Sequence, residues 1–275
     1  MKILRRYKFD WFVCLFFVYL AVKAVFFDSL INVVIPPDYN YHVGVSKIYK
    51  NNPKIIFFWN KGDVKISCDD LVRYNPPVST SPFLYHSIVG KVWFLTGSLK
   101  ITSLIQTIFG LLTVFYVYLL ARMISERKIV TYLAMVIAGS LPMFSYEINY
   151  LTYDNLVNLA GAASIYYLMI YWKKRKISDL VKLFIFLFVG SLTKITFGPL
   201  LIIILFLLAI LVNKSIFKVI KNFFGFLFKK KNFWLTFVFL FFLGLTLAFY
   251  GRNLIKYRAL FPKYSYYLER DCLPK

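Results

Sequence analysis

The residues of this chain that could do chemistry lie at the ends of long apolar segments. Asp38 and His42 follow the first apolar segment directly, in the stretch IPPDYNYH. Other polar residues border later apolar segments, namely Asn75, Glu147, Asp154, Lys194, Arg252, Asn253, Lys256 and Tyr257. A carboxylate beside several cations suits a transfer reaction on an anionic lipid. The cations hold a phosphate, and the carboxylate accepts a proton from the attacking hydroxyl.

Each of these residues also has a purely structural interpretation. Asp38 follows a Pro-Pro pair and could cap the helix that it begins. His42 lies one helical turn further on the same face, where a hydrogen-bonded histidine is more common than a catalytic one. Asp154 could be the N-cap of the segment that follows it, and the cations could reach lipid head groups. Their common position on one side of a membrane is therefore what indicates a site.

The composition predicts a membrane protein that crosses the bilayer several times. Of the 275 residues, 60% are hydrophobic, and the mean hydropathy is +0.65. Soluble domains contain about 45–50% apolar residues. The formal net charge is +22, but the basic residues mostly flank apolar segments, as the positive-inside rule expects. This distribution favours anionic lipids or lipid-linked substrates as partners and argues against nucleic acid.

Seven membrane spans are predicted from the apolar segments. The basic sequences MKILRRYK before the first span and KKRK after the fourth place these ends in the cytoplasm. The segment 180–212 is too long for one span at a rise of about 1.5 Å per residue, so we divide it at SLTKITFGP, with Lys194 near the outer turn. The predicted spans are 11–34, 101–123, 129–146, 155–172, two within 180–212, and 233–250.

The segments between the spans complete an all-α polytopic membrane fold, which we treat as one transmembrane domain over the whole chain. A long outer loop over 35–100 contains two short surface helices, near 38–52 and 81–97. Lysines and phenylalanines alternate in 213–232, which predicts an interfacial cytoplasmic helix. The tail 251–275 is expected outside. We expect a multi-pass protein of a bacterial cytoplasmic membrane, with the N-terminus inside and the C-terminus outside.

The three cysteines predict neither a zinc site nor a redox motif, because no CxxC pair is present. Cys68 and Cys272 both fall on the outer side of this topology, where disulfides can form. A bond between them would tie the tail to the outer loop, and two separate thiols are the alternative. Cys14 lies in the first predicted span and is expected to be a buried thiol. No set of residues has the spacing of a metal site, so no cofactor is predicted, and the sequence leaves open whether a divalent metal is needed.

The order of motifs along the chain resembles that of the GT-C glycosyltransferases. The branch that includes protein O-mannosyltransferases and lipid A aminoarabinose transferases is the most similar. Members often read PPDE followed by His, where this chain has PPDYNYH, and carry a second Pro-Pro, here NPPVSTSPF. The segments LPMFSYEINYLTYDNL, GSLTKITFGP and YGRNLIKYRALFP resemble later parts of that family. The resemblance extends over about 31–262.

This resemblance implies a seven-span module with two juxtamembrane helices in the first outer loop. It implies transfer of a sugar from a polyprenyl-phosphate donor, outside the cytoplasm and with inversion. Asp38 matches the family's catalytic base, with His42 beside it. Lys194 and Arg252 would hold the lipid phosphate. Asp154, Asn253 and Tyr257 complete the expected substrate-binding set, because they too are predicted on the outer side.

Two departures from the family pattern keep other functions open. Tyr39 stands where members often have Glu, so the contacts ascribed to that Glu do not carry over. Most relatives also continue beyond the seventh span. The chain therefore fits a minimal enzyme, a subunit that needs a partner, a fragment or an inactive relative. The alternatives to a glycosyltransferase are a non-catalytic GT-C-like subunit or assembly factor, and a transporter of lipid-linked substrates.

Overall fold

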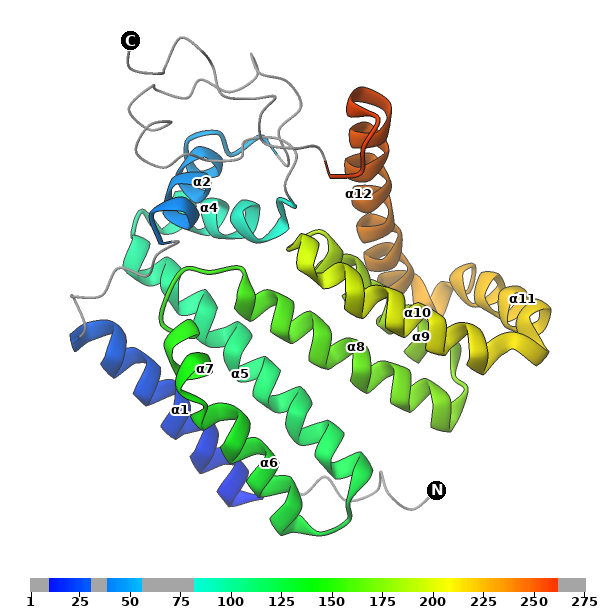
Figure 1. Cartoon of the computed structure of the whole chain (residues 1–275), viewed down its shortest axis with the longest axis horizontal. Helices are drawn as coiled ribbons and strands as arrows, with labels where there is room; N and C mark the ends of the chain where they lie inside the picture. Colours follow the sequence, from blue (N-terminus) through cyan, green and yellow to red (C-terminus); the bar gives the residue numbers. More distant parts are fainter. Residues whose placement is uncertain (1–9, 31–38, 56–81, 262–275) are drawn as a thin grey trace.

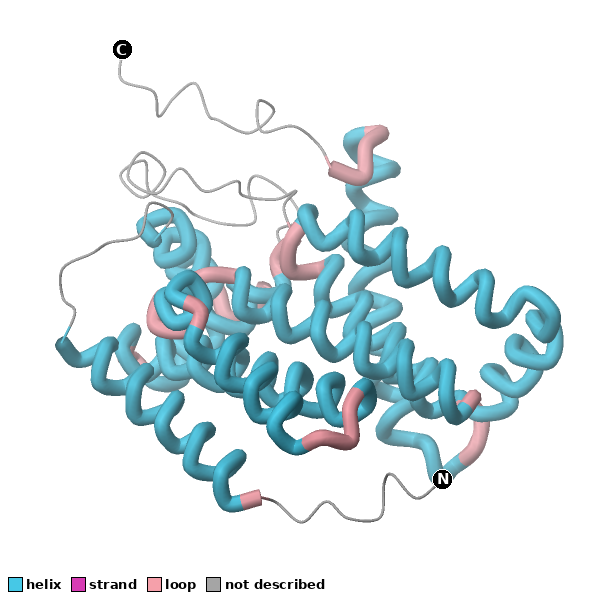
Figure 2. Tube along the Cα trace, turned by 60° about the horizontal axis from the view of Figure 1, so that its bottom comes forward, coloured by secondary structure: helices cyan, strands magenta, loops and turns pink. Residues whose placement is uncertain are grey.

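The computed structural model describes residues 10–30, 39–55 and 82–261, and all regular structure within these ranges is helical. Figure 2 shows how short the loops between the helices are. This architecture confirms the predicted all-α fold. Asp38, Asn75, Cys68 and Cys272 lie outside the described residues, so the predictions made for them stay predictions. The expectation of a buried thiol at Cys14 is wrong, because this side chain lies on the exposed surface of α1.

Five helices form the first part of a bundle and lie side by side in Figure 1. The most extensive contacts join α8 to α9 and to α5, and α5 also contacts α1 and α6. The five helices are α1 (Trp11–Leu30), α5 (Leu99–Ile124), α6 (Lys128–Ser140), α8 (Asp154–Lys174) and α9 (Ile177–Ser191). Apart from α6, they begin and end within four residues of the predicted spans, because charged and turn-forming residues flank each apolar run.

The remaining part of the bundle follows the turn after α9. A 3₁₀ turn, η2 (Ile195–Phe197), leads into α10 (Gly198–Val212), which contacts α8. The amphipathic helix α11 (Ile216–Leu227) and the long helix α12 (Phe233–Tyr257) both pack on α9. The predicted break of 180–212 is therefore confirmed.

Two short helices lie at one end of the bundle, as Figure 1 shows. They are α2 (Tyr39–Asn51) and α4 (Leu84–Thr96), which pack against each other, and α4 also contacts α5. A Cβ atom on Gly90 of α4 would come within 2.4 Å of the Tyr49 Cβ atom and 2.5 Å of the Ser46 carbonyl oxygen in α2. The glycine therefore allows the two helices to approach this closely.

The predicted third span differs from the structure, which has two helices there. α6 ends at Ser140, and the short helix α7 (Pro142–Glu147) follows it. Leu141 has φ −54° and ψ 127°, outside the helical region. A residue before proline is pushed toward extended backbone, and the proline cannot donate to the preceding turn. Pro142 therefore interrupts the segment that the hydropathy predicted to be continuous.

Within the described part of the chain, three helical segments are long and apolar enough to cross a membrane, Leu99–Ile124, Ile195–Val212 and Lys230–Tyr257. Trp11–Phe26 and Lys128–Ser140 are shorter apolar helices. Apolar side chains such as Ile202, Phe206 and Ile210 are exposed along α10, as in a lipid-facing helix. The chain is thus an integral membrane protein, and the count of seven spans stays a prediction.

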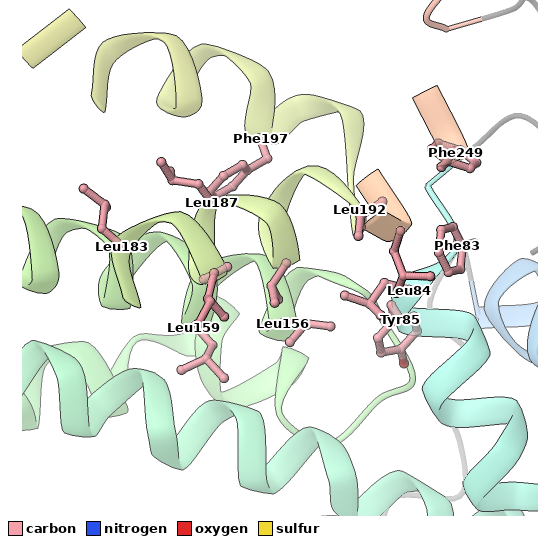
Figure 3. Close-up of a cluster of buried hydrophobic side chains, with 14 of the residues drawn as sticks. Phe83, Leu84, Tyr85, Leu156, Leu159, Leu183, Leu187, Leu192, Phe197 and Phe249 are labelled. Carbon is pink, nitrogen blue, oxygen red and sulfur yellow. The ribbon is translucent and has the colours of Figure 1, made fainter. Parts of the chain in front are cut away.

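A buried apolar cluster connects the short helices to the bundle, and Figure 3 shows it. Phe83 at the start of α4 packs on Phe249 of α12, with 5.3 Å between the ring centroids. The Leu84 backbone N–H donates to the Leu192 carbonyl (2.9 Å). Leu156 of α8 belongs to the same cluster. The cluster therefore holds α4 beside the start of α8 and the turn after α9.

Candidate active site

The start of α8 holds an acidic side chain in a defined position. Asp154 is the first residue of the helix, and Tyr153 occupies the N-cap without a side-chain capping bond. The Thr152 hydroxyl donates to Asp154 Oδ2 (2.9 Å) and accepts from the Asp154 backbone N–H (3.3 Å). Asp154 therefore does not cap α8, and its Oδ1 atom is left for a second partner. The helix dipole stabilises a carboxylate at this end of the helix.

That second partner is Lys194, from the turn between α9 and α10. Its Nζ atom lies 2.6 Å from Asp154 Oδ1, and the two side chains are 24% and 33% exposed. The same Nζ atom lies 4.4 Å from the centroid of the Tyr153 ring. Gly190 shapes this turn, because a Cβ atom there would come within 2.4 Å of the Phe197 ring. The structure thus joins two residues, 40 positions apart, that the sequence placed on one membrane side.

His42 of α2 reaches the same place from the other direction. Its ring contacts Tyr153 edge to face, with 4.5 Å between the centroids. Its Nδ1 atom lies 2.9 Å from Nε2 of His86 in α4, so one ring donates a hydrogen bond to the other. The exposed fractions are 3% for His42 and 2% for His86. The two histidines therefore link α2 to α4 behind Tyr153.

Burial sets the charge of this histidine pair. It lowers the pKa of His42 to about 4, and the positive Lys194 lowers it too, while the negative Asp154 acts in the opposite direction. Burial also lowers the pKa of His86 well below its usual value, and His42 adds to this effect. Both rings are therefore neutral at pH 7. A neutral imidazole donates one hydrogen bond and accepts one, as the contact between them requires.

A buried polar network supports the start of α8. The Gln106 amide of α5 donates to the Tyr85 hydroxyl of α4. Asn155 Nδ2 donates to Gln106 Oε1 (3.0 Å) and to the Glu147 carbonyl (2.7 Å). Tyr85, Gln106 and Asn155 are each 0% exposed. Buried polar groups need such partners, so the network fixes α4, α5 and the end of α7 around Asp154.

Glu147 brings a second carboxyl group toward the site. Its Oε2 atom accepts from Asn158 Nδ2 (3.2 Å). Burial raises the pKa of Glu147, and the charge of Asp154 raises it further, while Lys194 acts in the opposite direction. The carboxyl group therefore takes up a proton more readily than a solvated glutamate. The sequence placed Glu147 on the outer side, and the structure places it near Asp154.

The residues predicted from α12 form a second group. The guanidinium carbon of Arg252 lies 5.8 Å from the centroid of the Tyr257 ring, and Lys256 Nζ lies 5.5 Å from the same point. Asn253 is 0% exposed and donates to the Leu260 carbonyl (3.2 Å). The charge of Arg252 also acts on Tyr49 of α2, where it opposes the rise in pKa caused by burial. The structure thus brings His42, Asp154 and Lys194 together, whereas Arg252 is connected to α2 through the effect of its charge on Tyr49.

α12 nevertheless approaches the turn that carries Lys194. The Tyr250 hydroxyl donates to the Ser191 carbonyl at the end of α9 (2.6 Å). This bond joins α12 to α9 three residues before Lys194. Both groups therefore lie at the same end of the bundle, where the sequence placed them.

Sequence reasoning missed the residues that hold the site together. His86, Tyr85, Gln106, Tyr153 and Asn155 were not predicted as site residues, although Tyr153 and Asn155 lie in the segment LPMFSYEINYLTYDNL that resembles the family. One signal was available, because the chain contains only two histidines and they bond to each other. Among the described residues, no group of three or more His, Cys, Asp or Glu side chains could hold a metal ion.

Comparison with protein families gives a match for the central part of the chain. The model described as dolichyl-phosphate-mannose-protein mannosyltransferase matches residues 88–229, just over half of the chain. The matched segment contains both Asp154 and Lys194, whereas Asp38 and His42 precede it. Comparisons with curated proteins and with solved structures found no match.

Proposed function

The chain belongs to the dolichyl-phosphate-mannose-protein mannosyltransferase family of GT-C membrane glycosyltransferases, and we propose that it transfers a sugar from a polyprenyl-phosphate donor. The acceptor is used on the extracytoplasmic side, and the sugar is transferred with inversion. The observation that carries this proposal is the Lys194–Asp154 pair inside the matched segment. It supplies a cation for a phosphate at the end of the bundle that faces away from the basic loops.

The proposed topology has seven crossings, made by α1, α5, the α6–α7 pair, α8, α9, α10 and α12. Two contacts support a common cytoplasmic end. Lys173 Nζ donates to the Met123 carbonyl (2.8 Å), and Arg175 Nη1 donates to the Leu211 carbonyl (2.8 Å). These bonds bring the basic ends of α5 and α8 together with the end of α10, opposite to Asp154. The N-terminus would then lie inside and the C-terminus outside, in a bacterial cytoplasmic membrane and as one transmembrane domain.

Lys194 is the proposed phosphate ligand. Its ammonium is partly exposed and already pairs with a carboxylate, so a lipid phosphate would replace one anionic partner by another. Arg252, together with Asn253 and Tyr257, would approach the donor from α12. The ion pair between Asp154 and Lys194 would form again after the product leaves.

Asp38 is the proposed general base. It stands four positions before His42, and four residues of chain span at most about 14 Å. In the proposed step the acceptor hydroxyl gives its proton to the Asp38 carboxylate and its oxygen forms a bond to the anomeric carbon. The bond from that carbon to the phosphate oxygen breaks on the opposite face. The polyprenyl phosphate leaves with the electron pair, and Lys194 and Arg252 stabilise its charge. Neutral His42 would orient the acceptor.

The test is the replacement Asp38→Asn in the full chain, reconstituted in vesicles with a panel of polyprenyl-phosphate sugars. We expect loss of transfer without loss of the helical signal or of the apparent melting temperature. The control Glu126→Gln removes an exposed carboxylate between α5 and α6, at the other end of the bundle, and should leave transfer unchanged. Full activity of Asp38→Asn would refute the assignment of the base.

Tyr39 favours a second candidate function, because the family often has Glu at this position. The chain would then be a non-catalytic GT-C-like subunit. Purification with a stoichiometric partner, and no turnover by the chain alone with any donor of the panel, would support this function over the first. Movement of a lipid-linked sugar across vesicles without transfer would instead support a transporter.

A further inference from the structure

The helix α11 has an apolar surface that is only partly used for packing. Val219, Phe223, Phe226 and Leu227 pack against the apolar cluster of the bundle. The Phe223 ring lies 5.4 Å from that of Phe239 in α12 and 6.2 Å from that of Phe184 in α9, centroid to centroid. These contacts hold one side of α11 on the protein.

The adjacent side of α11 is apolar and uncovered. Phe217 is 86% exposed, Phe224 is 56% exposed, and Phe228 directly after the helix is 85% exposed. Ile220 lies between them on the same side, at 47% exposure. Monomeric proteins rarely leave several large apolar side chains together in water, so this surface needs an apolar environment.

The third side of α11 is basic. Lys218 and Lys221 are exposed, and Lys229, Lys230 and Lys231 follow the helix. Within the described residues, none of these five lysines forms an ion pair. The sequence contains no Asp or Glu at all from 180 to 268. This lysine cluster therefore attracts anions and has no nearby acid on its own stretch of chain.

The neighbouring helices decide where α11 lies. The segments Ile195–Val212 and Lys230–Tyr257 are both long and apolar enough to cross a membrane, and α11 connects them. A helix between two crossings must remain at one membrane surface. An amphipathic helix at that level buries its apolar side among the acyl chains and keeps its lysines at the phosphates.

We propose that α11 and the lysine cluster form a binding site for anionic phospholipid head groups. The exposed apolar side chains would lie among the acyl chains, and Lys218 and Lys221 would contact the head-group phosphates. The site is distinct from the proposed catalytic residues, since it lies beside the ends of α10 and α12 that face away from Lys194. It does not depend on glycosyl transfer.

The first test measures lipid preference. The full chain in detergent is titrated with phosphatidylglycerol and with phosphatidylcholine, and bound lipids are counted by native mass spectrometry. In the double variant Lys218→Gln/Lys221→Gln, the preference for phosphatidylglycerol should fall by about fivefold per lysine. The control Lys54→Gln/Lys100→Gln removes two exposed lysines at the other end of the bundle and should keep the preference.

Three results would overturn the proposal. One is an unchanged preference in Lys218→Gln/Lys221→Gln, and another is an equal loss in the control. The third is displacement of phosphatidylglycerol by inorganic phosphate at the same concentration, which would assign the lysines to a free anion.

A second test probes the apolar side with Phe228→Trp in vesicles, using the wild type to subtract the five native tryptophans. The new fluorescence should be quenched by lipids brominated on their acyl chains. Quenching by acrylamide alone would place the residue in water. Quenching by neither would indicate that another protein covers it, and either result would contradict a lipid site.

Discussion

At the scale of single residues, the site depends on a few side chains that come from different helices. Tyr153 is the centre, because Lys194 lies against its ring and His42 contacts the ring edge to face. Asp154 is the next residue and completes the ion pair. The sequence predicted Asp154, Lys194 and His42 because they border apolar segments. It did not predict Tyr153, since an aromatic residue beside an apolar segment has no distinctive spacing. For His86 the only signal was that the chain has two histidines.

The Lys194–Asp154 pair should matter more for donor binding than for stability. Both side chains are partly exposed, and such pairs contribute about 0–1 kcal/mol to folding. Lys194→Gln should therefore leave the apparent melting temperature nearly unchanged and raise the KM for the polyprenyl-phosphate donor about tenfold or more, since it removes a charged hydrogen bond of roughly 1.5–3 kcal/mol. Steady-state kinetics measure this. Lys100→Gln is the matched control and should keep the KM of the wild type. If the KM of Lys194→Gln were no higher than that of the control, the role of Lys194 would be contradicted.

The buried histidine pair predicts a dependence of stability on pH. The pKa values of His42 and His86 are lowered in the folded state, so the unfolded state binds more protons between pH 6.5 and about 4. Stability is therefore fully present above pH 6.5 and falls as the pH decreases through this window, by about 3 kcal/mol for His42. The apparent melting temperature should fall accordingly. The double variant His42→Gln/His86→Gln should lose this part of the pH dependence; identical slopes would show that the pair does not titrate on unfolding.

At the scale of helices, most boundaries could be predicted because charges, prolines and glycines mark the ends of the apolar segments. The break at SLTKITFGP is confirmed by the turn between α9 and α10. The break between α6 and α7 was missed, although Pro142 is visible in the sequence, because mean hydropathy does not register a single proline. The contact between α2 and α4 could not be predicted, since it depends on the tertiary approach of two helices around Gly90.

Gly90→Ala should separate α2 from α4. The new methyl group would overlap the Ser46 carbonyl and the Tyr49 Cβ atom, which are not flexible side-chain ends. We expect a loss of about 1–3 kcal/mol, seen as a lower apparent melting temperature, together with reduced transfer because His42 moves away from His86. Gly244→Ala in α12 meets no heavy atom within 4 Å and serves as the control. If both variants behaved like the wild type, the close approach would not hold α2 in place.

At the scale of the whole molecule, the distribution of charge agrees with the proposed orientation. The basic ends of α5 and α8 meet the end of α10 at one end of the bundle, and the Lys194–Asp154 pair lies at the other. This arrangement could be predicted from the positions of Lys and Arg, because these residues are enriched in cytoplasmic loops. The residues in mutual contact on the outer side could not be predicted, since lying on the same side of the membrane does not determine the distance between two side chains. The structure accordingly brings His42 to Tyr153, whereas Arg252 contacts Tyr257 of its own helix.

Single cysteines in a cysteine-free background should report this orientation. Lys100→Cys, at the start of α5, should react with a membrane-impermeant thiol reagent added outside intact cells. Glu126→Cys, between α5 and α6, should react only after permeabilisation. Both positions are exposed, so accessibility to the reagent decides the outcome. Equal labelling of the two before permeabilisation would contradict the seven-span topology.

The central claim is that Lys194 and Asp38 serve one lipid-phosphate site, and an experimental structure of the full chain with bound polyprenyl phosphate tests it most directly. We predict a phosphate oxygen about 2.8 Å from Lys194 Nζ, with Asp154 released and the Asp38 carboxylate facing the same cavity. A phosphate bound elsewhere, with Asp38 capping α2 at a closed surface, would contradict the account and favour a role as a non-catalytic subunit.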